Sequence, residues 1–538
     1  MLSKQEQAAL RSRMFRHLDG IATAPSAYTL KAHGVTDFLI QHGESDLQTL
    51  TKQFNANEGY LNVALRVLCS QGWLDQKVDN LADTVTFKIN AQSETAFRYF
   101  DLYEGVVDLL KLSEKYHNRK FDIEPFQKLE AIFSGYRDNY NITPQSDMER
   151  DILDQVLAHI EGIIVGPTLV LLGMNGMFHK YFMETRFKPE EFHKDADGFE
   201  RLLNILSYLG WFNKQNGTFA FNDKGLFFAK RASAYGVTVS YIPTLRKLDD
   251  LIFGDPNILK GSDAHGNERH VDREMNVWGS GGAHASYFKV VDEFIIDVFS
   301  KPIDQQPKGI LDMGCGNGAF LIHLYSVIEN HTSRGKMLDE HPLILIGADY
   351  NEAALKVTKA NIIQADIWAK MIWGDIGDPE RLANDLKESY NIELSDLLNV
   401  RTFLDHNRVW EVPSKRDDLP ASSSSGAYAS NGQRLNNNLV SQSLREHFGK
   451  WSPYVKKHGL LLIELHTVKP ELVSQNLGKT PATAYDATHG YSDQYIVEVD
   501  EFVKVMEEVG LSRDKENFRK FPDSDLATIT INLFSASV

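Results

Sequence analysis

An apolar run that ends in an acidic residue and alternating glycines constrains the fold of this chain more than any other feature. Residues Ile310–Met313 are typical of a buried β-strand, and Gly314, Gly316 and Gly318 follow directly. Glycine has no Cβ and adopts positive φ angles readily, so this turn would let backbone N–H groups approach a bound molecule closely. A strand, a glycine-rich turn and a helix form the first unit of many doubly wound α/β sheets. The run therefore predicts such a sheet, with a ligand site at the carboxyl ends of its strands.

A second strand with an acidic end indicates which ligand the turn binds. Leu343–Ala348 is apolar and precedes Asp349, whose carboxylate is well placed to hold a ribose diol. The spacing G-x-G-x-G differs from the dinucleotide fingerprint G-x-G-x-x-G. Asp312 would repel a pyrophosphate, whereas it suits the ammonium group of S-adenosylmethionine (SAM). We therefore predict a SAM site, in preference to a dinucleotide site or a turn without a ligand. The residues expected to bind SAM are Asp312, Gly314, Gly316, Asn317, Gly318, Asp349, Tyr350, Asp375, Ile376 and Arg401.

Strand-like and helix-like segments alternate in the C-terminal half of the chain, which is typical of a doubly wound sheet. Asp375 ends the third unit, where its carboxylate would accept from the adenine amine while Ile376 packs on the ring. We expect a Rossmann-like core of the class I SAM methyltransferase type. Its other expected strands are Gly309–Met313, Leu343–Ala348, Leu397–Phe403, Gly459–Leu465 and Thr528–Phe534.

An internal repeat marks the N-terminal half. Val63–Leu74 recurs as Arg201–Phe212, and each copy has apolar residues at helical spacing, then Gly-Trp, then a β-like stretch. A helix, a glycine stop and a hairpin predict two winged-helix-like modules. Such modules can bind DNA, but these helices carry only Arg66 or Arg201, so we favour a lid or scaffold. We expect a mainly helical region with these modules at 1–240, a connecting active-site segment at 241–305 and the SAM-binding core at 306–538.

Composition limits the partners and the compartment. The chain has 538 residues, which predicts two or three domains, because single cores rarely exceed roughly 250–300 residues. Its net charge is −16 without a basic cluster, which argues against nucleic acid as a partner. The two cysteines lie far apart, which predicts a reduced, cytoplasmic protein. No apolar run approaches the roughly 20 residues needed to cross a bilayer, so we expect no membrane segment.

Two polar segments interrupt the predicted elements. The Gly/Ser cluster in residues 272–284 is too dense for a helix interior, so we expect either a domain linker or a loop that reaches the active site. Residues 414–438 include the run Ser422–Ser425 and are expected to form a mobile loop.

Side chains after two strand ends are the candidate chemical groups. Asp405 and His406 follow the fourth strand, His466 follows the fifth, and His489 is expected in a loop beyond it. A histidine that takes a proton is the default base of an O-methyltransferase. Two imidazoles on neighbouring loops could instead hold a divalent metal ion, and either could simply be a hydrogen-bonding residue. The candidate catalytic residues are Asp405, His406 and His466, and the candidate metal ligands are His466 and His489.

Seven stretches between residues 265 and 495 carry a family resemblance. They are His265–Arg273, Asp312–Gly318, Gly347–Ala353, Gly374–Glu380, Arg401–His406, Glu464–His466 and His489–Tyr495. Together they resemble the methyltransferase domains of GNAT-type polyketide loading modules, such as those that start apratoxin A and saxitoxin biosynthesis. The SAM turn alone is common to a superfamily, whereas the joint set is specific to this group.

The resemblance implies a reaction and its partners. It implies C-methylation of an acyl chain, typically malonyl, on an acyl carrier protein, to make a branched starter unit. It also implies one divalent or trivalent metal ion, iron or manganese, that the malonyl group chelates; such an ion would stabilise an enolate as a Lewis acid. His466 matches the family's metal-binding histidine, and His489 stands where the saxitoxin homologue has Gln. Family members usually continue into an acyltransferase-like domain, so neighbouring synthase domains are expected partners.

Two alternatives remain open. The first is a metal-free SAM O- or C-methyltransferase of natural-product biosynthesis, with His406 or His466 as the base. The second, from another functional class, is a non-catalytic SAM-fold scaffold that binds a carrier protein.

Overall fold

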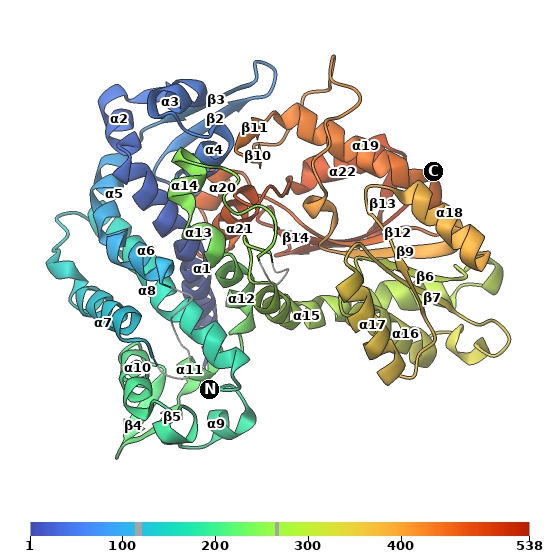
Figure 1. Cartoon of the computed structure of the whole chain (residues 1–538), viewed down its shortest axis with the longest axis horizontal. Helices are drawn as coiled ribbons and strands as arrows, with labels where there is room; N and C mark the ends of the chain where they lie inside the picture. Colours follow the sequence, from blue (N-terminus) through green and yellow to red (C-terminus); the bar gives the residue numbers. More distant parts are fainter. Residues whose placement is uncertain (1, 113–120, 264–267, 537–538) are drawn as a thin grey trace. The chain divides into compact units, whose positions relative to one another are not determined.

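The computed structural model of the chain describes residues 2–112, 121–263 and 268–536. These residues form two compact units, which we call the helical unit and the sheet unit (Figure 1). The helical unit includes two short returns from the C-terminal half of the chain. Three residues of the family stretches, 265–267, lie outside the described residues. The helical unit comprises Met1–Ala283, Ala427–Arg434 and Lys469–Ser492, and the sheet unit comprises His284–Gly426, Leu435–Val468 and Asp493–Val538.

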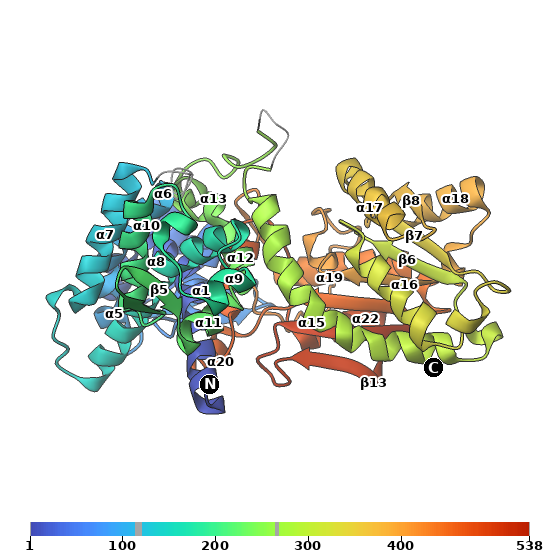
Figure 2. The ribbon, with the colours of Figure 1, turned by 90° about the horizontal axis from the view of Figure 1, so that it is seen from below.

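A seven-stranded sheet forms the centre of the sheet unit, in the order β13-β14-β12-β9-β6-β7-β8. The five strands from β12 to β8 run parallel, and β14 is antiparallel to both of its neighbours. Helices α16 and α17 cover one face, and α18, α19 and α22 cover the other (Figures 1 and 2). This is the class I SAM methyltransferase fold that the sequence predicts. The strands are β6 (Gly309–Met313), β7 (Ile344–Asp349), β8 (Lys370–Trp373), β9 (Leu397–Thr402), β12 (Leu460–Leu465), β13 (Leu511–Phe521) and β14 (Ile529–Ala536). The helices are α15 (Arg273–Ser300), which begins in the helical unit, α16 (Ala319–His331), α17 (Glu352–Gln364), α18 (Pro379–Tyr390), α19 (Asn437–Val455) and α22 (Val499–Glu508).

The edge strand β13 is an element that the sequence does not reveal. It forms an antiparallel hairpin with β14, with Leu511 opposite Ala536. Its sequence is rich in charged residues and lacks the apolar alternation of a core strand. Charged side chains are common on edge strands, because one side of the strand has no partner to pack against.

The repeat in the helical unit folds as predicted in both copies. Helix α4 leads to Gly72 and the buried Trp73, and α10 leads to Gly210 and the buried Trp211. The two glycines have φ angles of 82° and 80°, which other residues rarely adopt. A hairpin follows each tryptophan, formed by β2 and β3 or by β4 and β5. The helices of this unit are α1 (Lys4–Ala32), α2 (Val35–His42), α3 (Leu47–Phe54), α4 (Glu58–Ser70), α5 (Ser93–Tyr99), α6 (Glu104–Lys111), α7 (Ile123–Arg137), α8 (Asp147–Met174), α9 (Lys180–Glu184), α10 (Ala196–Tyr208), α11 (Asp223–Ala229), α12 (Ser233–Ser240), α13 (Ile242–Leu245), α14 (Leu248–Phe253), α20 (Pro470–Ser474) and α21 (Ala482–Gly490). The short strands are β1 (Glu44–Asp46), β2 (Asp75–Asp79), β3 (Thr84–Lys88), β4 (Phe212–Gln215), β5 (Thr218–Phe221), β10 (Tyr428–Ser430) and β11 (Gln433–Leu435).

The Gly/Ser cluster before the core is helical, so the expectation of a linker or loop was wrong. It forms the first half of α15. Gly279 lies against Gly236 of α12, and a Cβ on Gly279 would meet the Gly236 Cα at 2.6 Å. The small residues therefore permit a close approach of two helices, which offsets their low helix propensity.

The serine run is bonded to the start of α22, so the expectation of a mobile loop was wrong there. The N–H and hydroxyl of Ser423 both donate to Glu501, at 2.9 and 2.8 Å. Ser425 contacts Glu498 in the same way, at 2.9 and 2.8 Å. A polar segment is disordered only where its polar groups have no protein partners, and here two carboxylates are those partners.

Helix α8 is long and apolar enough to span a membrane by length and composition alone, which the sequence expectation overlooked. However, 89% of its most apolar window is buried inside the structure. Such burial is typical of a core helix, and α1 packs along α8 in the helical unit.

Candidate active site

Hydrogen bonds to the end of β7 hold the glycine turn that follows β6. The N–H groups of Gly314 and Cys315 donate to the carbonyl oxygen of Ala348, at 2.8 and 3.1 Å. The N–H of Gly316 donates to Oδ2 of Asp349 at 3.0 Å. All three glycines of the turn have positive φ angles, of 78°, 56° and 78°. The turn and the acidic end of β7 therefore form one surface at the carboxyl edge of the sheet.

Asp312 is the buried acid beside this turn. It is 2% exposed, and its Oδ2 atom has no hydrogen-bond partner among the described residues. Burial, with a smaller contribution from Asp349, raises the pKa of Asp312 to about 7. A cation next to Oδ2 would favour the charged form. The ammonium group of SAM is such a cation, so the turn and this carboxylate fit the predicted cofactor.

The other predicted SAM residues in the loops lie at the same edge. Oδ1 of Asn317 accepts the N–H of Ala319 at 3.0 Å, and Asp375 accepts the N–H of Gly377 at 2.7 Å. Tyr350 is 67% exposed, and its carbonyl accepts the indole N–H of Trp373 at 3.0 Å. These residues follow β6, β7 and β8, and their contacts with SAM stay predictions.

Arg401 lies at the end of β9 and packs against α19. Its guanidinium carbon is 3.8 Å from the centroid of the Trp451 ring, and its side chain is 0% exposed. The indole N–H of Trp451 donates to the carbonyl oxygen of Ile376 at 2.7 Å. Trp451 therefore links Arg401 to the predicted adenine segment. A direct contact between Arg401 and SAM stays a prediction.

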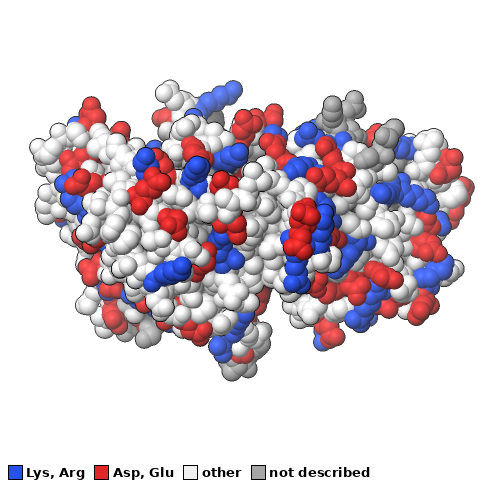
Figure 3. Space-filling model, turned by 90° about the horizontal axis from the view of Figure 1, so that it is seen from above, with Lys and Arg blue, Asp and Glu red and all other residues white. Residues whose placement is uncertain are grey.

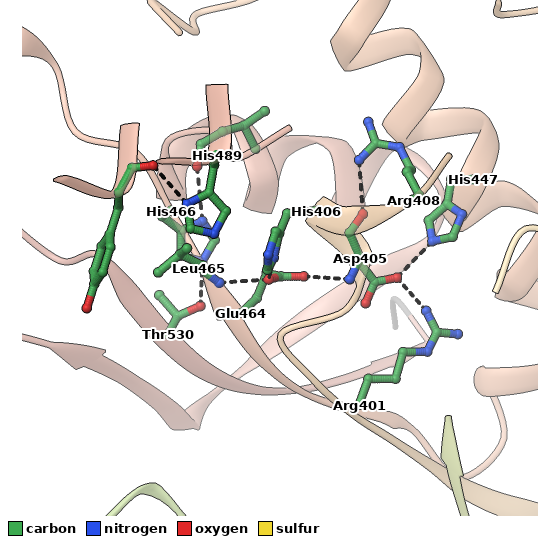
Figure 4. A network of polar contacts seen from close by, with 12 residues as sticks. Arg401, Asp405, His406, Arg408, His447, Glu464, Leu465, His466, His489 and Thr530 are labelled. Atoms are coloured by element: carbon green, nitrogen blue, oxygen red, sulfur yellow. Dashed lines mark hydrogen bonds and ion pairs between the residues drawn. The ribbon is translucent and has the colours of Figure 1, made fainter. Parts of the chain in front are cut away.

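His406 and Glu464 form a buried imidazole–carboxylate pair (Figure 4). Nδ1 of His406 lies 2.5 Å from Oε1 of Glu464. The same carboxylate accepts the N–H groups of Leu465 and Asp405, at 2.7 and 3.0 Å. With Nδ1–H donating to Glu464, Nε2 of His406 is the nitrogen that can accept a proton. The sequence pattern predicts a functional role for His406 but not for Glu464. The signal for Glu464 was an acidic residue inside an apolar strand, close to the histidine that follows that strand.

Leu404 places this pair beside the SAM turn. A Cβ on Gly314 would lie 2.9 Å from Cδ2 of Leu404. Strands β6 and β9 are parallel neighbours, with Met313 opposite Arg401, so both chains leave the sheet side by side. The proposed cofactor turn and the histidine loop therefore share one edge of the sheet.

Two donors hold one oxygen of the Asp405 carboxylate, while Oδ2 has no hydrogen-bond partner among the described residues. Its Oδ1 atom lies 2.6 Å from Nη1 of Arg401 and 2.8 Å from Nε2 of His447, and its carbonyl accepts from Arg408 at 3.1 Å. Burial opposes the charged form, but Arg401 and His447 outweigh it and lower the pKa of Asp405 to about 2. The carboxylate is therefore ionised at neutral pH, and a catalytic role for Asp405 stays a prediction. The sequence did not single out His447.

Both ring nitrogens of His466 contact protein oxygens. Nδ1 lies 3.1 Å from the carbonyl oxygen of Val497, and Nε2 lies 2.8 Å from Oγ1 of Thr530. The residue is 0% exposed, and burial lowers the pKa of His466 to about 4. His466 is thus a neutral imidazole that ties the end of β12 to β14.

His489 belongs to the helical unit, in α21 and not in the loop that the sequence predicts. Its Nδ1 atom lies 2.8 Å from the carbonyl oxygen of Tyr485, one turn earlier. The ring centroid of Tyr241 lies 6.0 Å away. A histidine that donates through Nδ1 keeps its lone pair on Nε2, as metal ligands often do.

The predicted metal site does not fit His466 as it is placed, because neither nitrogen presents a lone pair without a protein partner. Within residues 2–112, 121–263 and 268–536, no group of three or more His, Cys, Asp or Glu side chains is arranged to hold a metal ion. The two predicted ligands belong to different units, so the pair stays a prediction.

The mixed, mostly parallel sheet and the glycine turn with its acidic partners define a class I SAM-dependent methyltransferase. Three family models match the chain: the AprA MT2-like domain over residues 268–532, the AprA winged helix domain over 161–255 and the AprA N-terminal domain over 10–76. The chain therefore contains the three domains of the AprA family and is a SAM-dependent methyltransferase.

Several solved methyltransferases have a similar fold. An O-methyltransferase family protein from Burkholderia thailandensis is 11% identical, with 69% of this chain and 94% of that chain covered and a TM-score of 0.39. The mitomycin 7-O-methyltransferase MmcR is 12% identical, with 73% and 100% covered and a TM-score of 0.41. The CurJ carbon methyltransferase is 12% identical, with 82% and 99% covered and a TM-score of 0.33. No curated protein matches the sequence.

Proposed function

We propose that this chain transfers a methyl group from SAM to the α-carbon of a malonyl-type acyl chain on an acyl carrier protein. The buried pair of His406 and Glu464 at the SAM edge of the sheet carries the proposal. The family resemblance supports the carrier-bound substrate and the polyketide starter unit as context. Neighbouring synthase domains and a cytoplasmic location belong to the same proposal.

The pair suits removal of a proton from carbon. The α-carbon of a malonyl thioester is a weak acid, so a base must accept its proton as the new C–C bond forms. Nε2 of His406 accepts that proton, and the carboxylate of Glu464 stabilises the resulting imidazolium through Nδ1. SAM supplies the methyl group when bound. Burial of both residues excludes water and strengthens their interaction.

A metal-assisted form of the reaction, with iron or manganese at His466 and His489, is the second candidate. The contact of His489 Nδ1 with the Tyr485 carbonyl favours it, because that contact orients the ring as in many metal sites. The occupied nitrogens of His466 oppose it.

Intact-protein mass spectrometry of malonyl-carrier protein, incubated with the chain and methyl-labelled SAM, tests the proposal. We expect a mass gain of one methyl group or more, and a His406→Ala variant should lose most of it. Methylation of a hydroxyl substrate alone would favour an O-methyltransferase, and no transfer to any acyl-carrier substrate would favour a scaffold.

Rigorous chelation and re-addition of iron or manganese separate the two forms of the reaction. Activity that survives chelation and depends on His406 supports the proton-transfer form. Activity that is lost on chelation and restored by one metal, in the wild type but not in His466→Ala, would overturn it.

A further inference from the structure

We propose that His447 in α19 is a positioning residue: by holding Asp405, it fixes the loop that carries His406 against Glu464. The inference rests on the proposed function, because it assigns a role in the same proton transfer.

A short chain of contacts connects His447 to the proposed base. Nε2 of His447 lies 2.8 Å from Oδ1 of Asp405, and the backbone N–H of Asp405 donates to Oε2 of Glu464 at 3.0 Å. His406 follows Asp405 in the chain and contacts the other oxygen of Glu464 at 2.5 Å. One residue, Asp405, therefore anchors the base and its carboxylate partner together (Figure 4).

Burial makes this contact hard to replace. His447 is 6% exposed, and Asp405 is 0% exposed. Burial lowers the pKa of His447, so its imidazole is neutral at neutral pH and donates through Nε2–H. Loss of that donor leaves a buried carboxylate with Arg401 as its remaining side-chain partner, and water cannot enter freely to replace it.

The preceding residue of α19 holds the far end of the same loop. The carboxylate of Glu446 accepts the N–H groups of Ser414 and Lys415, at 2.8 and 3.1 Å. Between the two anchors exposed and buried residues alternate, with Val409 86% exposed and Arg408 5% exposed. Successive residues of one helix therefore contact both ends of this segment, and the ring of Trp410 packs against Tyr495 between them.

Three variants test the role of His447. His447→Phe keeps a planar ring but removes the donor, whereas His447→Gln keeps an N–H donor at similar reach. His458→Phe is the matched control, because this half-buried histidine lies between α19 and β12 and has no part in the site. Steady-state methyl transfer to malonyl-carrier protein gives kcat and KM, and calorimetry gives the Kd for SAM.

We expect His447→Phe to lower kcat by roughly tenfold to a hundredfold, with the Kd for SAM changed by less than about twofold. His447→Gln should recover most of the loss, and His458→Phe should match the wild type. An unchanged kcat in His447→Phe would overturn the proposal. An equal loss of kcat in both His447 variants, with weaker SAM binding and a lower Tm, would show that the contact only stabilises the fold. That result would also overturn the proposal.

A second measurement does not depend on the acyl substrate. The Nδ1–H proton of His406 should give a downfield NMR resonance, which the loss of that signal in His406→Ala identifies. We expect the resonance to broaden in His447→Phe and to return in His447→Gln. If His406→Ala abolishes the resonance but leaves turnover intact, the proposed function fails. If His406→Ala lowers turnover while His447→Phe leaves both turnover and the resonance unchanged, only the positioning role fails.

Discussion

The Nδ1 atom of His406 lies 2.5 Å from Oε1 of Glu464, although the two residues are 58 positions apart in the chain. Parallel pairing of β9 with β12 brings them together, with Arg401 opposite Leu462. The imidazole follows the end of β9, while Glu464 is the second-to-last residue of strand β12. The sheet, and not a local motif, therefore builds the proposed base.

Replacement of Glu464 by Gln should lower kcat for methyl transfer by about a hundredfold, because the amide cannot stabilise the imidazolium of His406. The Kd for SAM should change by less than about twofold, since Glu464 is not among the predicted SAM residues. Methyl-labelled SAM and calorimetry measure the two quantities. Glu388→Gln, an exposed change on α18, is the control. Turnover equal to the control would contradict the assignment.

The affinity for SAM should depend on pH through Asp312. Its folded pKa is raised to about 7, so below that value the carboxyl group must lose a proton before it can pair with the SAM ammonium. The Kd should therefore weaken by up to about tenfold per pH unit as the pH falls below about 7, and level off above it. Asp312→Asn should bind SAM more weakly at pH 8 and show a flat profile. Calorimetry over this range measures both slopes, and parallel slopes would exclude Asp312.

The stability of the SAM-free chain should respond to the same group with the opposite sign. The folded state holds the Asp312 proton between about pH 4 and about pH 7, whereas the unfolded state has released it. Stability from this group is present at the acid end and is lost as the pH rises to about 7. Asp312→Asn should thus gain stability relative to the wild type as the pH rises through this window, which thermal unfolding at several pH values measures.

Two glycines of the turn should separate stability from cofactor binding. A Cβ on Gly314 would lie 2.9 Å from Leu404 at a φ of 78°, so Gly314→Ala should lower both Tm and SAM affinity. At Gly316 the nearest atom is 4.0 Å away, so Gly316→Ala should cost only the backbone strain of about 1 kcal/mol. Its Cβ would instead occupy the cradle expected for SAM and weaken binding by at least about tenfold. Differential scanning fluorimetry and calorimetry distinguish the two effects, and wild-type SAM affinity in Gly316→Ala would contradict the cradle.

The sheet was predictable from the sequence because its signals are local. Apolar runs end in acidic residues or glycines at β6 and β7, and the structure has these strands within one residue of the predicted bounds. By contrast, the helical start of α15 depends on Gly236, a residue far from Gly279 in the chain. Composition alone cannot show that α12 packs against this segment, so the composition favoured a linker or loop.

The site shows the same division. The place of His406 after a strand end was predictable, whereas nothing in the sequence indicates that His447, in the middle of α19, contacts Asp405. The composition of the serine run likewise predicts disorder, because it does not show that Glu498 and Glu501 at the start of α22 accept its hydrogen bonds. Functions that arise from long-range packing leave no pattern in a single sequence.

His466 should make the chain sensitive to acid. Its folded pKa is lowered to about 4 from 6.5, so between these values the unfolded state binds a proton that the folded state does not. Stability from the neutral imidazole is complete above about pH 6.5 and falls as the pH drops toward about 4, by about 3 kcal/mol at 1.36 kcal/mol per unit. His466→Gln should flatten this slope, and His341→Gln, at an exposed position, should not. Chemical unfolding at a series of pH values measures it. If His466 instead binds a metal ion through Nε2, added iron or manganese should raise the Tm of the wild type but not of His466→Gln. The metal ion would then replace Thr530 as the partner of Nε2.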